Sequence, residues 1–218
     1  VASSGGNPYY MIELLRNGTE AIDGYEAPRS LTRLLHGRVM ALGAEARRLL
    51  EVCCVLAKHS TLERIEACTH LTRSALLQAL DELEFSGMIE LQLARILCRH
   101  DLLSSVVTAQ MSAAARTMLH RFAGAMLEEE AATTQAVGLI WDTAEHWLAA
   151  CDASRAIQSL RRCGNHLMDV GMPSEAVRVF ERAESLTSST HLKYAIGAAR
   201  SRALLEAERP LEAIAALE

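Results

Sequence analysis

The stretch TRSALLQALDELEFSGMIELQLARILCRHD (residues 72–101) decides the fold, because its hydrophobic period changes partway along it. In residues 72–87 leucines recur at intervals of three and four behind a threonine suited to capping, which predicts a helix. Residues 88–99 suit a pair of strands instead, and we expect the break between them near residues 92–95. Two further helical patterns precede this stretch. Three helices followed by a small β-hairpin predict a winged helix-turn-helix.

The two preceding helical patterns cover residues 44–58 and a short helix that Thr61 is expected to cap. In the short helix the predicted apolar positions are Leu62, Ile65 and Ala67. In the helix of residues 72–87 and just after it, the corresponding positions are Leu76, Leu77, Leu80, Leu83 and Met88.

Further toward the N-terminus, residues 9–17 predict a short helix and residues 18–28 a loop. Pro28 suits the first position of the next helix, which we expect Gly43 to end. The spacing of its apolar residues predicts one buried stripe, formed by Leu31, Leu34, Leu35, Val39 and Leu42.

The second half of the chain has the pattern of paired helices that repeat. Residues 174–183 predict the second helix of a pair, with small Ala176 and bulky Phe180 packing on the partner helix of residues 154–170. A Glu-Ala pair recurs 37 residues later at positions 212 and 213, close to the repeat length of about 34 that is typical of tetratricopeptide repeats. A tetratricopeptide-like superhelix is our prediction, and an unclassified helical array is the alternative.

We therefore predict an all-α protein with one small β-hairpin, divided into three segments. Residues 1–28 form the end of a preceding core and a loop, residues 29–110 a winged-helix domain, and residues 111–218 the helical repeats. The first residues, VASSGG, resemble neither a signal peptide nor an initiator, so we expect this chain to be part of a longer protein.

Composition and charge limit the classes of partner. Half of the 218 residues are hydrophobic, 22% are charged, and the formal net charge is −5. Residues 1–110 hold 11 basic and 13 acidic side chains and residues 111–218 hold 11 and 14, so neither half is basic. Nothing in this distribution favours nucleic acid or an anionic membrane. No apolar run of 18 residues occurs, so no membrane span is expected.

The cysteines at positions 53, 54, 68, 98, 151 and 163 follow no regular spacing. We interpret them as reduced, buried residues of a cytoplasmic protein.

Motifs for catalysis are absent from the sequence: it contains no phosphate-binding Gly-rich loop, GxSxG, HExxH or paired CxxC. We do not expect this chain alone to be an enzyme. Cys98, His100 and Asp101 lie close together, but a zinc site needs a second group of ligands, and only Cys68 and His70 resemble one. We predict no metal site, and from the residues alone we expect Asp101 to cap the helix that follows.

The winged-helix pattern also suggests direct DNA binding as a function. A recognition helix lies along a dense row of phosphates, which favours cations on its surface. The helix of residues 72–87 offers only Arg73, against three carboxylates at Asp81, Glu82 and Glu84. A DNA-binding regulator is therefore the least favoured function.

Six segments, taken in order, resemble the C-terminal part of the STAND class of signal-transduction ATPases, above all large bacterial transcriptional regulators of the LuxR type with an AAA-like ATPase. The segments that carry the resemblance are GNPYYMIELL (6–15), SLTRLLHGRVMALGAEARRLLEVCCVLA (30–57), ALLQALDELEFSGMIE (75–90), RHDLLSSVV (99–107), MLHRFAGAML (118–127) and AEHWLAACDASRAIQSLRRCG (144–164).

The resemblance implies three residues that contact nucleotide in the parent protein. Pro8 corresponds to the proline that touches adenine, His100 to the winged-helix histidine that contacts the β-phosphate of ADP, and Asp101 to a residue that orients or caps beside it. An imidazole beside the free N–H groups of a helix start suits a phosphate oxygen. ATP or ADP is thus implied for the parent, a slow ATPase switch. Without the phosphate-binding loop, we expect this fragment to bind no nucleotide tightly.

The function implied by the resemblance is regulatory. The chain would couple the nucleotide state to signal sensing and oligomerisation in a STAND-type transcriptional regulator. Its expected partners are an upstream nucleotide-binding core and a protein or small-molecule signal on the helical repeats, with no direct nucleic acid contact and no membrane. The alternative is a free-standing helical-repeat scaffold that binds a peptide or protein.

Overall fold

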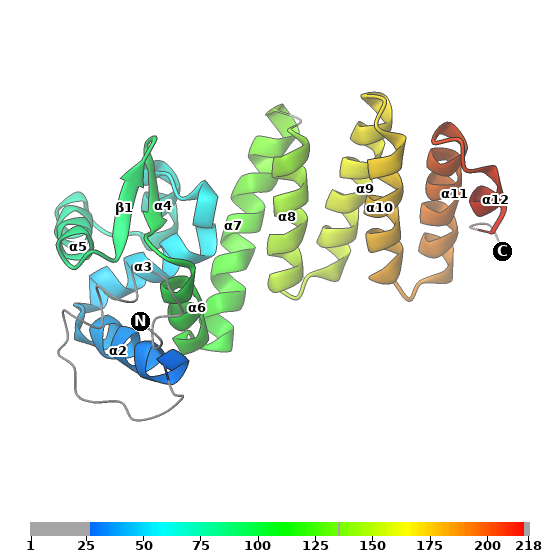
Figure 1. The fold of residues 1–218 in the computed structure, drawn as a ribbon. Helices are drawn as coiled ribbons and strands as arrows, with labels where there is room; N and C mark the ends of the chain where they lie inside the picture. The colour runs from blue at the N-terminus through cyan, green and yellow to red at the C-terminus, as the bar shows by residue number, and fades with distance from the viewer. Residues whose placement is uncertain (1–26, 135, 216–218) are drawn as a thin grey trace. The chain divides into compact units, whose positions relative to one another are not determined.

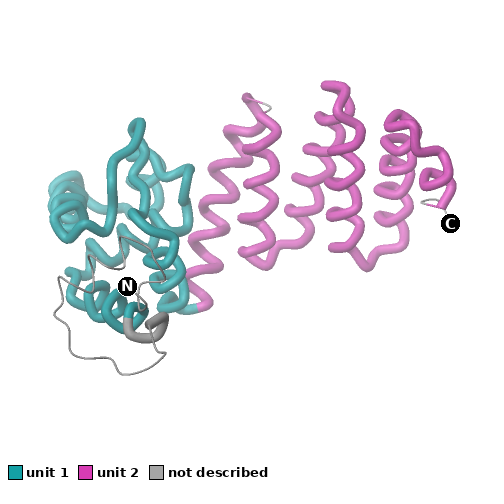
Figure 2. The backbone as a smooth tube through the Cα atoms, in the orientation of Figure 1, with its two compact units in different colours: residues 1–112 teal, residues 113–218 magenta. Residues whose placement is uncertain are grey.

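A computed structural model describes residues 27–134 and 136–215 of the chain. The predicted helix of residues 9–17, most of the predicted loop after it, and Pro8 lie outside the described residues. The described part is mostly helical, with a small two-stranded antiparallel sheet. Figure 2 shows its division into two compact units, unit 1 (residues 1–112) and unit 2 (residues 113–218).

The helices and strands follow the order given by the sequence patterns (Figure 1). In unit 1 they are α2 (Ala27–Ala41), α3 (Ala44–Leu56), the 3-10 helix η2 (Ala57–His59), α4 (Leu62–Thr69), α5 (Arg73–Phe85), β1 (Ile89–Gln92), β2 (Arg95–Cys98) and α6 (Asp101–Gln110). In unit 2 they are α7 (Ala113–Thr134), α8 (Val137–Ala149), α9 (Ala153–Asp169), α10 (Pro173–Ser185), α11 (Thr190–Glu206) and α12 (Pro210–Ala215).

Two predicted helix caps are confirmed. The Thr61 hydroxyl accepts a hydrogen bond from the Arg64 amide at 3.4 Å, and the Thr72 hydroxyl accepts one from the Ala75 amide at 3.3 Å. Each bond satisfies an amide that the first turn of a helix leaves without an intrahelical partner. The starts of α4 and α5 are therefore set by local chemistry.

The predicted hairpin is confirmed as an antiparallel pair. Its register runs from Ile89 opposite Cys98 to Gln92 opposite Arg95. Leu93 and Ala94 form the turn with φ values of 48° and 63°. Positive φ at both central residues is the conformation of a type I′ turn, which suits the twist of the strands although it favours Asn and Gly. The break between the strands lies where the sequence predicts it.

Helix α3 is the centre of unit 1. Its buried residues include Leu49, Leu50 and Cys53, and the helix contacts α4, α5, α6 and β2. The predicted apolar stripe of α5 is only partly correct, because Leu77 is 61% exposed while Ala79 is buried. The structure likewise places Leu62 and Ala67 of α4 on the exposed side, and Ile65 and Cys68 form its buried contact instead.

Unit 2 is a row of helices in which each packs on its sequence neighbours, from α7 to α12 (Figure 1). The predicted pairing of α9 with α10 is confirmed, since Ala176 and Phe180 are both buried and α10 contacts α9. The Phe180 ring lies against Gly164: a Cβ built on this glycine would meet ring atom Cε1 at 2.5 Å. The small residue at position 164 therefore makes room for the large one at position 180.

Candidate functional site

His100 and Asp101 lie at the junction between the hairpin and α6. The Arg99 amide donates to the Met88 carbonyl at 3.0 Å, which extends the pairing of the hairpin to the residue before His100. His100 then has extended backbone angles (φ −146°, ψ 141°) and is the N-cap residue of α6. The imidazole is half-buried and Asp101 is exposed. The end of the hairpin and the start of the helix thus fix where this histidine lies.

The expected cap by Asp101 is wrong. The structure makes His100 the N-cap and Asp101 the first helical residue, with its carboxylate in the first turn of α6. There it interacts favourably with the positive end of the helix dipole. His100 and Asp101 are adjacent in the sequence, and both lie at the N-terminus of α6. Pro8, the third predicted site residue, lies outside the described residues.

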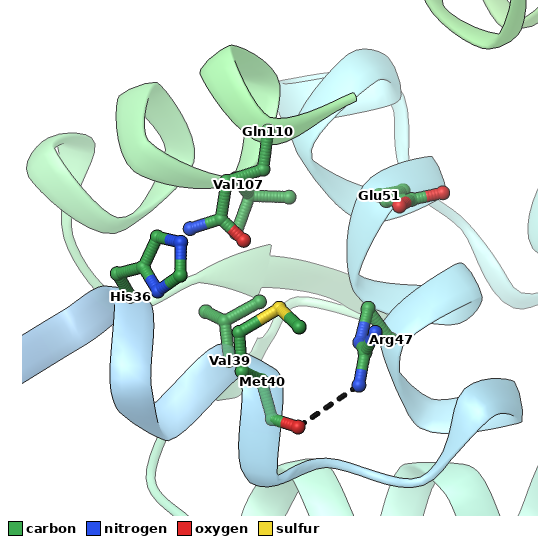
Figure 3. A pocket seen from close by; sticks show the side chains of 7 residues that line it. All are labelled: His36, Val39, Met40, Arg47, Glu51, Val107 and Gln110. Atoms are coloured by element: carbon green, nitrogen blue, oxygen red, sulfur yellow. Dashed lines mark hydrogen bonds between the residues drawn. The ribbon is translucent and has the colours of Figure 1, made fainter. Parts of the chain in front are cut away.

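Unit 1 also contains a cavity of about 470 Å³ that sequence reasoning missed (Figure 3). Helices α2, α3 and α6 line it with His36, Val39, Met40, Arg47, Glu51, Val107 and Gln110. The labelled side chains of His36 and Gln110 lie toward one side, and Arg47 and Glu51 come from α3 on the other.

The polar groups of this cavity differ in their hydrogen bonds and in their electrostatic surroundings. The Arg47 Nη2 atom donates to the Met40 carbonyl at 3.0 Å and to the Leu42 carbonyl at 3.1 Å, which joins α3 to the end of α2. Burial raises the pKa of Glu51, and the charges of Arg47 and Arg48 partly oppose that rise. The Gln110 Nε2 atom is buried with no hydrogen-bond partner among the described residues. Together these groups can form hydrogen bonds with a small polar molecule.

The sequence contains only a partial signal for this cavity. Arg47 and Glu51 are four residues apart, as are His36 and Met40, so each pair lies on one face of its helix. Which faces of α2, α3 and α6 meet is decided by the packing of the whole unit.

Two histidines meet inside unit 2. The Nδ1 atoms of His120 on α7 and His146 on α8 are 3.0 Å apart, and the ring centroids are 5.2 Å apart. Such a bond needs one Nδ1–H donor and one Nδ1 acceptor. Burial lowers the pKa of His120, and the nearby Arg116 charge lowers it further. Burial and the Arg116 charge therefore favour the neutral form of the His120 imidazole.

Among the described residues no group of three or more His, Cys, Asp or Glu side chains could hold a metal ion. Within the same residues, no helix combines the length and the apolar character needed to cross a membrane.

This chain has a weak similarity to one solved structure. No family model and no curated protein matches the chain. A similar solved structure is a Signal Transduction ATPase with Numerous Domains (STAND) protein with a tetratricopeptide repeat sensor from Pyrococcus horikoshii. It is 15% identical with a TM-score of 0.43, over 99% of this chain and 36% of that one. This chain thus spans about a third of that protein's length, and a similarity this low assigns neither fold nor activity.

Proposed function

We propose that this chain is a regulatory and protein-interaction part of a STAND-type, ATP-dependent transcriptional regulator. Unit 1 acts as a winged helix that docks on a nucleotide-binding core, and unit 2 is a tetratricopeptide-like array that receives the signal. The observation that carries the proposal is the position of His100. Its half-buried imidazole lies at the N-terminus of α6, directly after a hairpin, within the sequence RHDLL.

The order of elements in unit 1 supports the winged-helix assignment. Helices α3, α4 and α5 are followed by the β1–β2 hairpin, which is the order of that motif. The surface of α5 does not suit DNA, since Asp81, Glu82 and Glu84 are all exposed. The Glu82 carboxylate also accepts a hydrogen bond from the Gly43 amide at 2.8 Å, which gives it a structural role at the start of α3.

Exposed apolar side chains in unit 1 support docking on another protein surface. Phe85 at the end of α5 is 96% exposed and Leu93 at the hairpin turn is 99% exposed. Leu77 and Leu91 on the same two elements are exposed as well. Large apolar groups in water are a feature of interaction surfaces, because burying them against a partner releases free energy.

Unit 2 has the corresponding features of an interaction array. Four large hydrophobic side chains of α11 and α12 are exposed: Tyr194, Leu205, Leu211 and Ile214. A row of paired helices presents an extended surface on which a protein or small-molecule signal can bind. Signal binding and nucleotide exchange then shift the protein between a docked and a released packing, and the released state self-associates.

The test is His100→Ala in the full-length parent protein, with bound ADP measured after gel filtration. We expect faster loss of ADP, because the imidazole contact that holds the docked state is removed. His191→Ala, a substitution of an exposed histidine in unit 2, is the matched control and is expected to retain ADP as the wild type does.

Unchanged ADP retention in His100→Ala would favour the alternative, a free-standing helical-repeat scaffold whose exposed α11–α12 surface binds a peptide. A DNA-binding role predicts salt-dependent affinity for random duplex DNA. We expect no detectable binding in that assay.

A further inference from the structure

Two cysteines that are far apart in the sequence meet in unit 1, in a partly buried contact. Cys54 lies in the last turn of α3 and Cys98 is the last residue of β2. Their Sγ atoms are 3.1 Å apart across 44 positions of the chain, and both are free thiols. A disulfide bond is about 2.05 Å long, so the sulfurs need to approach by only about 1 Å.

The surroundings give the two thiols different roles. Cys98 is half-buried and Cys54 is buried, so a small reagent reaches Cys98 more readily than Cys54. The hydrogen bond with Cys98 and burial both raise the pKa of the Cys54 thiol, and a hydrogen bond from the Ser104 side chain partly opposes them. Cys98 is therefore the thiol that reacts first, since nucleophilic attack requires a thiolate that the reagent can contact.

We infer that Cys54 and Cys98 form a redox-modification site whose co-substrate is a low-molecular-weight disulfide, such as oxidised glutathione. The Cys98 thiolate attacks one sulfur of that disulfide, forms a mixed disulfide and expels one thiolate. Cys54 then attacks the Cys98 Sγ atom and expels the second thiolate. The two protein thiols are oxidised to one disulfide, the reagent is reduced to two thiols, and its thiolates take up the two cysteine protons.

The bond has a structural consequence in unit 1. It ties the end of β2 to the end of α3, two elements that already contact each other. The Ser60 hydroxyl donates to the Ile96 carbonyl and the Ile96 amide donates to the Ser60 carbonyl at 2.8 Å, so the start of β2 is already held. The disulfide fixes the other end of the strand, two residues before His100. Any effect on nucleotide retention rests on the proposed function, but formation of the bond does not.

The experiment uses the whole chain, reduced and then exposed to oxidised glutathione. Remaining thiols are blocked with N-ethylmaleimide and the protein is digested with trypsin for mass spectrometry. The expected product is residues 49–58 joined to residues 96–99, two hydrogens lighter than the sum of the two reduced peptides, with neither linked cysteine alkylated. Dithiothreitol restores both alkylation sites.

Matched variants identify the sulfurs, because Cys53 and Cys54 share the tryptic peptide 49–58. Cys53→Ser is expected to form the cross-link as the wild type does. Cys54→Ser is expected to stop at glutathione on Cys98, and Cys98→Ser to lose both products. Circular dichroism checks that each variant is folded. The wild-type digest shows whether the two peptides are joined, and Cys53→Ser shows which cysteine of peptide 49–58 is joined. Persistent glutathione on wild-type Cys98 without a cross-link, a cross-link through Cys53, or no reaction would each overturn the inference.

Discussion

Gly164→Ala adds one methyl group where the Phe180 ring already lies against Gly164. The new Cβ would lie 2.5 Å from Cε1 and 2.7 Å from Cζ of Phe180, whereas carbon atoms pack at about 3.5–4.0 Å. Phe180 is 1% exposed, so its ring has no solvent to move into. Either the ring leaves its preferred rotamer or α9 and α10 move apart.

The magnitude follows from two opposing effects. Overpacking a filled core costs about 1–3 kcal/mol, and an overlap of about 1 Å with a buried ring belongs in the upper part of that range. Replacing glycine with alanine inside a helix stabilises the helix by about 1 kcal/mol. We therefore expect the free energy of unfolding of unit 2 to fall by about 1–2 kcal/mol.

Urea unfolding followed by circular dichroism measures the change. With a slope of about 2 kcal/mol per molar urea, the midpoint should fall by roughly 0.5–1 M. Gly138→Ala on α8 is the control, because a Cβ there would meet nothing within 4 Å. This control should match the wild type or exceed its stability by up to about 1 kcal/mol.

A double-mutant cycle of Gly164→Ala with Phe180→Leu measures the contact between these two residues separately from the effect of each substitution alone. The smaller side chain makes room for the new methyl, so the double variant should lose less stability than the sum of the single variants, by at least about 0.5 kcal/mol. If Gly164→Ala is as stable as Gly138→Ala, or the two losses simply add, then the ring does not lie against Gly164 and the packing described for α9 and α10 is wrong.

Two further predictions concern the hairpin turn and the histidine pair. Replacing Leu93 with Asn and Ala94 with Gly should raise the free energy of unfolding of unit 1 by up to about 1 kcal/mol for each change, because both positions have positive φ. Thermal unfolding measures the effect as a higher melting temperature. A lower melting temperature would contradict the turn geometry. Because burial and Arg116 lower the folded-state pKa of His120 below the unfolded value of 6.5, the unfolded chain binds this proton first as the pH falls. Unit 2 should therefore lose stability as the pH drops below 6.5 toward the folded-state pKa of His120. His120→Gln should weaken this pH dependence. If urea unfolding gives the wild type and His120→Gln the same dependence of stability on pH, the prediction is refuted.

Local features of the chain predicted most of the secondary structure. Thr61 and Thr72 cap α4 and α5 because a threonine hydroxyl reaches amides only three residues away. The change of hydrophobic period at Met88 predicted the hairpin, since strand and helix differ in which residues share a face. The order of hairpin and helix also indicated that His100 follows the last strand.

Periodicity was less successful in identifying the buried residues. A stripe of leucines on α5 predicted that Leu77 is buried, yet Leu77 faces solvent and the smaller Ala79 lies in the core. The stripe shows which side of a helix is apolar, but the width of the buried face depends on how closely α3 and β1 approach it. The interpretation of all six cysteines as buried was wrong for two of them, since Cys151 is exposed and Cys98 is half-buried.

The sequence by itself determined the helices, the hairpin and the succession of paired helices, because caps, turns and hydrophobic periods act over a few residues. Only the tertiary structure decided which side chains meet across helices. The cavity between α2, α3 and α6, the sulfurs of Cys54 and Cys98, and the rings of His120 and His146 all depend on contacts between residues that are far apart in the chain. Such contacts follow from how whole faces of helices pack, and no local pattern specifies which faces meet.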